Sequence, residues 1–329
     1  MRIGNNPNNH KIMDLDTTSH RVIIPVYIPN AEGYFSDSLD VLKVCIESLL
    51  LTINKDTAVS VISNGSSVDV NNFIMTLMSE GKIDRAVFNK ENVGKMNAVM
   101  TETRASFEEF ITYSDADVFF DKGWLKETYS IFEAFPKAGF VSMNPMPCSY
   151  GYSSSAIIDT LLSIKKNSVK IKEVTPYEDL EHFHKSIGRD TAATQKLFSD
   201  TAILLSKKKI RCYIGAGHFC CTIRKKAVLP YVPQEKSNTS GSEKYYLDVP
   251  SEQSGYWRLS SIKSYVWHMG NVLESDWVKS KINGMSEFKE DDFSFGSGIS
   301  DASLFFSKLL PYKVKIRTSG FLKKMKILK

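Results

Sequence analysis

Four strand-like segments alternate with helix-like segments in the first half of the chain, and this alternation constrains the fold more than any other feature. The strand-like segments are short apolar runs rich in β-branched residues, and the segments between them repeat apolar residues every three or four positions. The expected strands are 21–28, 58–63, 85–88 and 110–114, and the expected helices are 38–53, 70–78, 94–107 and 122–135. This order predicts an α/β fold with a mainly parallel central sheet and helices on both faces.

The chain beyond residue 135 has a less regular pattern. We expect a strand at 139–143, a loop at 144–155 and helices between 156 and 206. A glycine-containing turn then leads into a strand near 224, part of 243–259 is expected to be helical, and a last strand covers 262–268. The chain is therefore divided into a flexible lead (1–20), two halves of one domain (21–145 and 146–275) and a C-terminal extension (276–329).

The composition, with 42% hydrophobic and 24% charged residues, is that of an ordinary globular protein. No apolar run is long enough to cross a bilayer, and the polar start of the chain has no signal-peptide core. The five cysteines are odd in number and scattered, which favours reduced thiols. These features predict a cytoplasmic protein.

The C-terminal tail is basic. From residue 313 to residue 329 there are seven lysines and arginines, interleaved with apolar residues, and no acidic residue. Such a segment suits the surface of an anionic membrane, so peripheral contact with the inner face of the cytoplasmic membrane is one expectation. A solvated chain end is the alternative. We expect no nucleic-acid partner.

Two aspartates, Asp115 and Asp117, follow the strand at 110–114 with one residue between them. In an extended chain both side chains point to the same side of the backbone, where they repel each other unless a cation lies between them. A hard divalent cation shared with a substrate phosphate is a common solution, and a solvated acidic turn is the alternative. Loops that contain Tyr27, Asn64 and Lys95 fall at the same edge of the predicted sheet, where parallel sheets bind ligands.

In this order and spacing, the sequence resembles the family 2 glycosyltransferases, which have the GT-A fold. The segments that carry the resemblance are 22–27, 64–67, 92–98, 114–117, 255–256 and 267–271. The resemblance implies transfer of a sugar, with inversion, from a nucleoside diphosphate donor to a hydroxyl of a glycan or lipid-linked glycan. It also implies a Mn²⁺ or Mg²⁺ cofactor, a UDP-sugar as the favoured donor and a role in bacterial cell-surface polysaccharide or lipopolysaccharide synthesis. The half 21–145 would bind the nucleotide-sugar, and the half 146–275 would bind the acceptor.

The resemblance also implies roles for individual residues. The residues expected to bind the donor are Pro25, Val26, Tyr27, Glu32, Asn64, Gly94, Lys95, Asp115 and Ala116. The expected metal ligands are Asp115, Asp117 and His268. The candidates for the general base on the acceptor side are Asp248, Glu252 and Glu243, in that order.

Two positions depart from the family pattern. The stretch 247–253 lacks the usual pair of adjacent acidic residues, so the choice of base stays open. Ser63 and Asn64 stand where the family often has an aspartate that contacts the base, which leaves the nucleotide open, although an amide can donate and accept hydrogen bonds.

Two other functions and a zinc site are alternatives to this prediction. A sugar nucleotidyltransferase should have a glycine-rich loop after the first strand, and residues 25–33 show none. A glycan-binding protein without catalytic activity would have no need of the aspartate pair. A zinc site at Cys212, His218, Cys220 and Cys221 lacks the spacing of structural zinc sites, so buried thiols are expected there.

Overall fold

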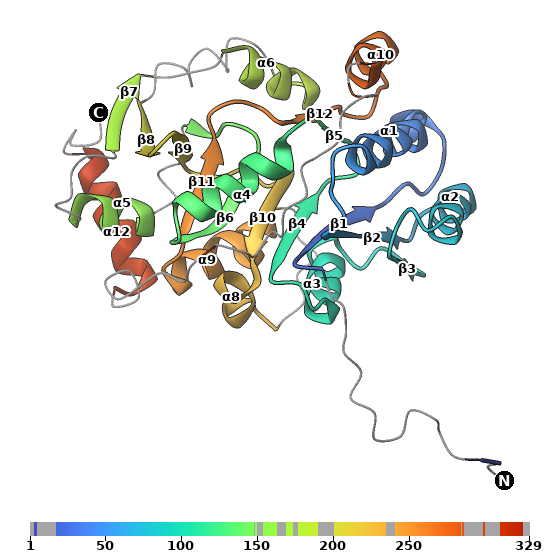
Figure 1. Ribbon diagram of the computed structural model, residues 1–329, viewed down its shortest axis with the longest axis horizontal. Coiled ribbons are helices and arrows are strands. Elements are labelled where there is room, and N and C mark those ends of the chain that lie inside the picture. Colours follow the sequence, from blue (N-terminus) through green and yellow to red (C-terminus); the bar gives the residue numbers. More distant parts are fainter. Residues whose placement is uncertain are drawn as a thin grey trace.

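The computed structural model describes residues 3–4, 18–147, 149, 154–162, 169–173, 177–189, 201–234, 241–283, 285, 299 and 310–324. Its centre is a ten-stranded mixed sheet in the order β3-β2-β1-β4-β10-β6-β11-β9-β8-β7 (Figure 1). The strands of this sheet are β1 (His20–Val26), β2 (Thr57–Asn64), β3 (Arg85–Asn89), β4 (Phe110–Ser114), β6 (Ala138–Ser142), β7 (Val169–Glu173), β8 (Thr201–Lys207), β9 (Ile210–Ile214), β10 (Cys220–Arg224) and β11 (Trp257–Ser261). A separate ribbon pairs β5 (Val118–Phe120) with β12 (Val266–His268).

Most strands of the large sheet run in one direction. β1, β2, β3 and β4 are parallel neighbours, and β6 and β11 share their direction. β10 runs the opposite way between β4 and β6, and so joins strands from both halves of the chain in one sheet. The two halves expected from the sequence are therefore parts of one continuous sheet.

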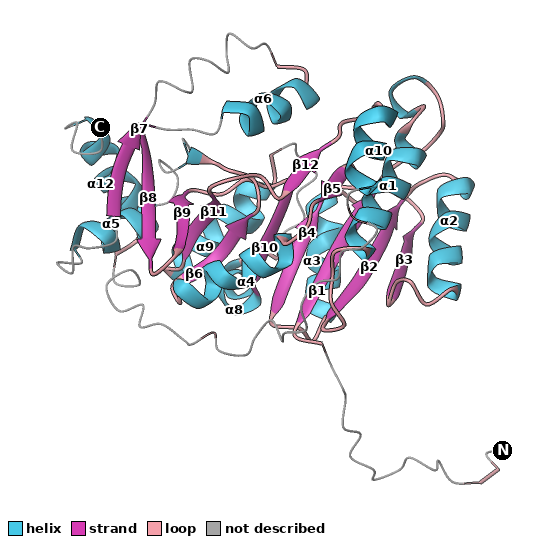
Figure 2. Ribbon diagram, turned by 45° about the horizontal axis from the view of Figure 1, so that its top comes forward, coloured by secondary structure: helices cyan, strands magenta, loops and turns pink. Residues whose placement is uncertain are grey.

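Helices cover both faces of this sheet (Figure 2). The helices are α1 (Ser38–Leu50), α2 (Val68–Ser79), α3 (Lys95–Ala105), α4 (Trp124–Ala134), α5 (Ser154–Leu162), α6 (Tyr177–Ser186), α8 (Lys225–Val228), α9 (Val249–Ser254), α10 (Ser275–Asn283) and α12 (Tyr312–Lys324), with short helical turns η1 (Gly33–Phe35), η3 (Leu229–Tyr231) and η4 (Lys244–Asp248).

The alternation of side chains along β1 separates the two faces. Val22, Ile24 and Val26 pack into the core that α1, α2 and α4 cover, whereas Ile23 packs into the core beneath α3 and α8. A strand with apolar residues on both sides is buried on both faces, which explains the continuous apolar run in the sequence. The α/β fold class with helices on both faces is confirmed.

The second half differs in part from the expectation. The predicted helices between 156 and 206 include α5 and α6, but β7 and β8 extend the sheet by antiparallel pairing in the same region. In the segment 243–259, which was expected to be partly helical, η4 and α9 are helical, whereas residues 257–261 form the strand β11. The predicted flexible lead at 1–20 lies almost entirely outside the described residues.

Part of the basic tail packs against the rest of the molecule. α12 lies beside α5 (Figure 1), and the ammonium group of Lys315 is buried, 2.9 Å from Ser155 Oγ and 2.7 Å from the carbonyl oxygen of Glu252. Part of the tail is therefore buried, which argues against the alternative of a fully solvated chain end. Within the described residues, no helix has the length and apolar character needed to cross a membrane.

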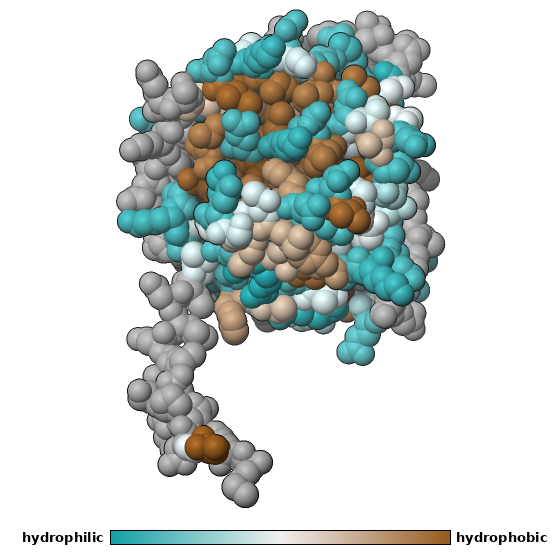
Figure 3. Space-filling model, turned by 90° about the vertical axis from the view of Figure 1, so that its right-hand side faces the viewer, coloured by the Kyte–Doolittle hydropathy of each residue, from teal (hydrophilic) through white to brown (hydrophobic). Residues whose placement is uncertain are grey.

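The side of the molecule that carries α2 and β3 is shown in Figure 3, where hydrophobic patches lie between hydrophilic side chains. The exposed large apolar side chains on these two elements are Val68, Met75, Met78 and Phe88.

Candidate active site

The β5–β12 ribbon brings Asp117 and His268 together. The amide of Met269 donates to the carbonyl oxygen of Asp117 at 2.7 Å, and Nε2 of His268 lies 3.3 Å from Oδ2 of Asp117. The amide of Asp115 donates to the carbonyl oxygen of Phe219 at 2.7 Å, which ties the aspartate pair to the turn before β10. Three segments that are distant in the sequence thus meet at the end of β4.

Asp115, Asp117 and His268 fit a divalent cation. One ligand atom from each lies within 4.8 Å of the others, and this is the only such group of potential metal ligands in the part of the chain that the structure describes. Oδ1 of Asp117 is buried without a hydrogen-bond partner. Two carboxylates and an imidazole suit Mn²⁺ or Mg²⁺, and the orphaned oxygen is the kind of atom that a cation would satisfy.

Electrostatics at this group also favour a positive charge. Burial, together with the adjacent Asp115 carboxylate, raises the pKa of Asp117 to about 7. Lys95, at the first turn of α3, forms an ion pair with Asp115 and lies 3.3 Å from Glu243. Burial alone would lower the pKa of Lys95, but Asp115 and Glu243 raise it above its usual range, so the lysine stays charged.

Cavities open on both sides of this cluster. The β1 cavity, about 250 Å³, is lined among others by Pro25, Tyr27, Asp117 and Ala116. The central cavity, about 850 Å³, is lined by the groups of the second half of the chain, including His268, Glu243 and Asp248. Lys95 and Asp115 line both, so the cavities meet at the predicted metal site.

The wall of the central cavity holds an ordered polar triad. Oδ1 of Asp248 forms an ion pair with Nη2 of Arg258 at 2.8 Å and lies 2.7 Å, a hydrogen-bond distance, from Nε2 of His218. Arg258 is buried on β11 beneath this wall. Glu243 is another carboxylate that lines the central cavity, and its partner Lys95 lowers its pKa against the opposing effect of burial.

Glu252 does not fit the predicted role of general base. It is 1% exposed and lines neither the β1 cavity nor the central cavity, and its Oε2 accepts a hydrogen bond from the amide of Ser155 at 2.8 Å. Burial, only partly offset by Arg258, raises its pKa to about 7. The backbone carbonyl oxygen of Glu252 accepts a hydrogen bond from the ammonium group of Lys315 on α12. Glu252 therefore belongs to the interior against which α12 packs.

Asn64 has contacts other than the expected contact with a base. It is buried, its Nδ2 donates to Oδ1 of Asn92, and its Oδ1 accepts from Asn89 and from the amide of Val93. Gly65 allows this close approach, because its φ is +83° and a Cβ there would lie 2.7 Å from the Asn92 nitrogen. Asn64 therefore shapes the loop that leads into α3.

Three further residues expected to bind the donor lie behind or beside the β1 cavity. Val26 is fully buried in the core, so its side chain cannot reach a ligand. Gly94 is the residue before α3, with a φ of +88°, and positions Lys95. Glu32 is exposed at the start of η1 and is not among the residues that line the cavity.

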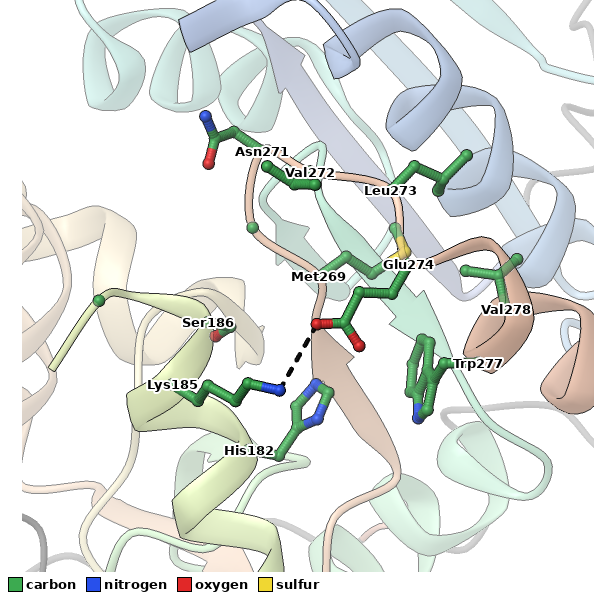
Figure 4. A pocket seen from close by; sticks show the side chains of 12 residues that line it. His182, Lys185, Ser186, Met269, Asn271, Val272, Leu273, Glu274, Trp277 and Val278 are labelled. Carbon is green, nitrogen blue, oxygen red and sulfur yellow. Dashed lines mark ion pairs between the residues drawn. The ribbon is translucent and has the colours of Figure 1, made fainter. Parts of the chain in front are cut away.

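A third cavity, about 270 Å³, lies between α6 and the segment that follows β12 (Figure 4). On its α6 side, His182 stacks on Trp277 with ring centroids 5.3 Å apart and Lys185 pairs with Glu274. Oγ of Ser186 lies 3.0 Å from Nδ1 of His268. Because a partner on Nδ1 sets the ring orientation, Ser186 leaves Nε2 directed at Asp117.

Several residues of the site were missed from the sequence. Arg258 and Ser186 carried no motif. His218 belonged to a cysteine-rich cluster and to the segment 215–218, which the family resemblance places on the acceptor side, but it was not among the predicted bases. The four cysteines among the described residues are buried thiols, as expected, and burial raises the pKa of Cys212, Cys220 and Cys221. A charged residue inside an otherwise strand-like run, such as Arg258, is the one signal that could have pointed to the buried pair with Asp248.

The mixed sheet with helices on both faces is that of the GT-A fold. The sequence model described as "Glycosyl transferase family 2" matches residues 22–193, more than half of the chain. The chain therefore belongs to glycosyl transferase family 2. None of the curated proteins compared matches it.

The chain is also similar to several solved structures, at low sequence identity. Residues 1–349 of S. aureus TarS are 13% identical with a TM-score of 0.43, over 76% of this chain and 60% of that chain. The same TarS fragment in complex with UDP-GlcNAc gives 13% identity and a TM-score of 0.44, over 82% and 65%. The mannosyltransferase PcManGT from Pyrobaculum calidifontis, in complex with GDP-Man and Mn²⁺, gives 12% and 0.45, over 95% and 77%. The chain thus spans about 60% of the TarS fragment.

Proposed function

We propose that this protein is a metal-dependent inverting glycosyltransferase that moves a sugar from a nucleoside diphosphate donor, with UDP favoured, to a hydroxyl of a glycan or lipid-linked glycan. The observation that carries the proposal is the position of Asp115, Asp117 and His268 where the β1 cavity and the central cavity meet. A donor in one cavity and an acceptor in the other would bring the reacting atoms together at this group.

The residues divide between the two substrates. In the β1 cavity, the half-exposed ring of Tyr27 offers a face to the nucleotide base, and Lys95 offers a positive charge to the diphosphate. Asp115, Asp117 and His268 would hold a Mn²⁺ or Mg²⁺ ion, which when bound neutralises the charge that grows on the leaving diphosphate. In the central cavity, Asp248 and Glu243 stand on the side from which the acceptor hydroxyl must attack.

Contact with an anionic membrane is a separate part of the proposal. Lys313 and Arg317 are exposed on α12, next to the exposed apolar side chain of Val314. These residues support docking to a surface that carries a lipid-linked acceptor, as in cell-surface polysaccharide synthesis. The double variant Lys313→Glu/Arg317→Glu should sediment less with phosphatidylglycerol vesicles than the wild type does. Equal sedimentation would end this part of the proposal.

The first experiment is a thermal-shift screen of UDP, GDP, TDP and CMP with and without Mn²⁺. A ligand that binds only the folded state raises its melting temperature by mass action, and no acceptor is needed. The expected result is a shift with one nucleoside diphosphate that depends on Mn²⁺. If none of the four nucleotides shifts the transition, the proposed donor site is wrong.

A further inference from the structure

The carboxylate of Asp248 faces the central cavity, but two neighbours already hold it. Its Oδ1 lies 2.8 Å from Nη2 of Arg258 and 2.7 Å from Nε2 of His218. Arg258 is always charged, and its side chain is only 2% exposed, so its guanidinium forms a buried ion pair with the Asp248 carboxylate. An ionised carboxylate can only accept hydrogen bonds, so the proton of this contact must be on Nε2 of His218.

This contact sets the tautomer of His218. With a proton on Nε2, the lone pair of a neutral imidazole is on Nδ1. Within the described residues, Nδ1 makes no hydrogen bond, and the side chain of His218 is 35% exposed in the wall of the central cavity. His218 therefore presents a free proton acceptor to the cavity, and its other nitrogen is held by a carboxylate.

The backbone around His218 is held as well. The amide of Gly217 donates to Oγ of Ser142 at 3.0 Å, and the guanidinium of Arg258 also reaches the carbonyl oxygen of Ala216 at 3.4 Å. Gly215 has a φ of +124°, and a Cβ there would lie 2.9 Å from the carbonyl oxygen of Met146. The turn that carries His218 is thus tied to the same arginine as Asp248.

We propose that His218 is the catalytic residue that accepts the proton of the acceptor hydroxyl, with Asp248 and Arg258 as the residues that position it. The proposal rests on the proposed function and assigns a base that the sequence had placed on a carboxylate. The arrangement has the logic of a base oriented by a carboxylate, as in other enzymes that activate a hydroxyl.

The other carboxylates are less suited to this role. Glu243 is paired with Lys95, whose positive charge stabilises the ionised form and weakens it as a base. Glu252 is buried away from the cavity. His218 is also close to the donor side in the chain. The carbonyl oxygen of Phe219, the next residue, accepts a hydrogen bond from the amide of Asp115.

The step balances with the groups named. A lone pair of the acceptor oxygen forms the bond to the anomeric carbon, and the bond from that carbon to the diphosphate oxygen breaks, with its electron pair leaving on the diphosphate. The hydroxyl proton moves to Nδ1 of His218, which becomes an imidazolium beside the Asp248 carboxylate. The proton then passes to solvent, and the neutral imidazole is restored.

The first arm of the test needs no substrate. Long-range ¹H–¹⁵N NMR of the wild-type protein at a pH where the imidazole is neutral, with the signal assigned by its loss in His218→Gln, should show the proton on Nε2. Asp248→Asn should change this tautomer preference, because an amide can donate as well as accept. A proton on Nδ1 of His218 in the wild type would overturn the proposal.

The second arm uses water in place of the acceptor. Release of nucleoside diphosphate from UDP-glucose and GDP-mannose is measured with Mn²⁺ for the wild type, His218→Gly and His218→Gln. His218→Gly should lose at least ~100-fold in turnover while it keeps the nucleotide-dependent thermal shift, and added imidazole should restore at least ~10-fold. His218→Gln, which leaves no space, should not respond to imidazole.

Turnover that survives in His218→Gly, or that imidazole fails to restore, would overturn the assignment of the base but not the donor site. If the wild type itself releases no nucleoside diphosphate and shows no thermal shift, the proposed function fails, and this assignment fails with it.

Discussion

At Asp117, one carboxylate oxygen lies 3.3 Å from His268 and the other is buried without a partner. Asp117→Asn keeps the shape of the side chain and removes its charge beside Asp115. We expect the variant to lose the Mn²⁺-dependent shift with nucleoside diphosphate and to lose at least ~100-fold in turnover, because a metal ion at this position contributes several kcal/mol. Thermal shift and nucleoside diphosphate release measure these effects.

The fold of this variant should stay intact, since the substitution removes one of two like charges that repel each other. Asp69→Asn, an exposed aspartate at the first turn of α2, is the matched control and should leave both readouts unchanged. Retention of the Mn²⁺-dependent shift in Asp117→Asn would show that the metal site is elsewhere.

At the scale of an element, the loop before α3 depends on one amide. Asn64 makes hydrogen bonds with Asn89, Asn92 and Val93. Asn64→Ala removes the three hydrogen bonds of this buried side chain, each contributing about 1 kcal/mol, so we expect a loss of about 2–3 kcal/mol in the free energy of unfolding. Nucleotide binding should weaken too, because the loop positions Lys95. Urea unfolding and the thermal shift with nucleotide measure the two effects. The exposed Asn72→Ala on α2 is the control, and equal stability of both variants would refute the role given to Asn64.

The C-terminal helix offers a comparison within one element. Lys315 is buried and bonded to Ser155 and Glu252, whereas Lys313 is exposed on the same helix. We expect Lys315→Ala to lower the free energy of unfolding by about 1.5–3 kcal/mol, the range for hydrogen bonds of a charged group, and Lys313→Ala to change it little. Chemical denaturation decides this, and equal effects of the two substitutions would mean that α12 does not dock as described.

Elements differed in how far the sequence could predict them. β1, β2 and β4 were predicted because their apolar, β-branched runs state their burial locally, and the aspartate pair was predicted because it follows directly from such a run. β11 was not predicted because Arg258 interrupts its apolar pattern, and the partners that make a buried arginine acceptable there, Asp248 and the carbonyl oxygen of Ala216, lie outside the strand. The contacts of Asn64 were not predicted either, because its partners at 89–93 belong to a loop whose course cannot be deduced from the local sequence.

At the scale of the whole molecule, buried ionisable groups link stability to pH, and they act in opposite directions. Burial lowers the pKa of His20 to about 3, and burial raises the pKa of Glu252 to about 7. His20 is inside the sheet, 2.7 Å from Oγ1 of Thr112 and 3.1 Å from Oγ1 of Thr57. Below pH 6.5, the ordinary pKa of histidine, His20 is protonated in the unfolded chain but stays neutral in the folded protein. His20 therefore makes stability fall with falling pH. Glu252 holds a proton in the fold above its ordinary pKa of 4.5, so its contribution changes the opposite way over part of the same range.

Because these contributions partly cancel, the pH dependence of the wild type alone cannot reveal either group, but a difference between two proteins can. In His20→Gln the titrating ring is absent, so its free energy of unfolding should lack the His20 contribution at every pH. Relative to this variant, the wild type should lose about 2 kcal/mol between about pH 7.5 and about pH 5, at about 1.4 kcal/mol per pH unit once below the ordinary pKa. Urea titrations of both proteins at the two pH values measure the difference. A difference that stays constant would mean that His20 is protonated in the folded protein, and that the sheet can accommodate a buried charge between Thr57 and Thr112.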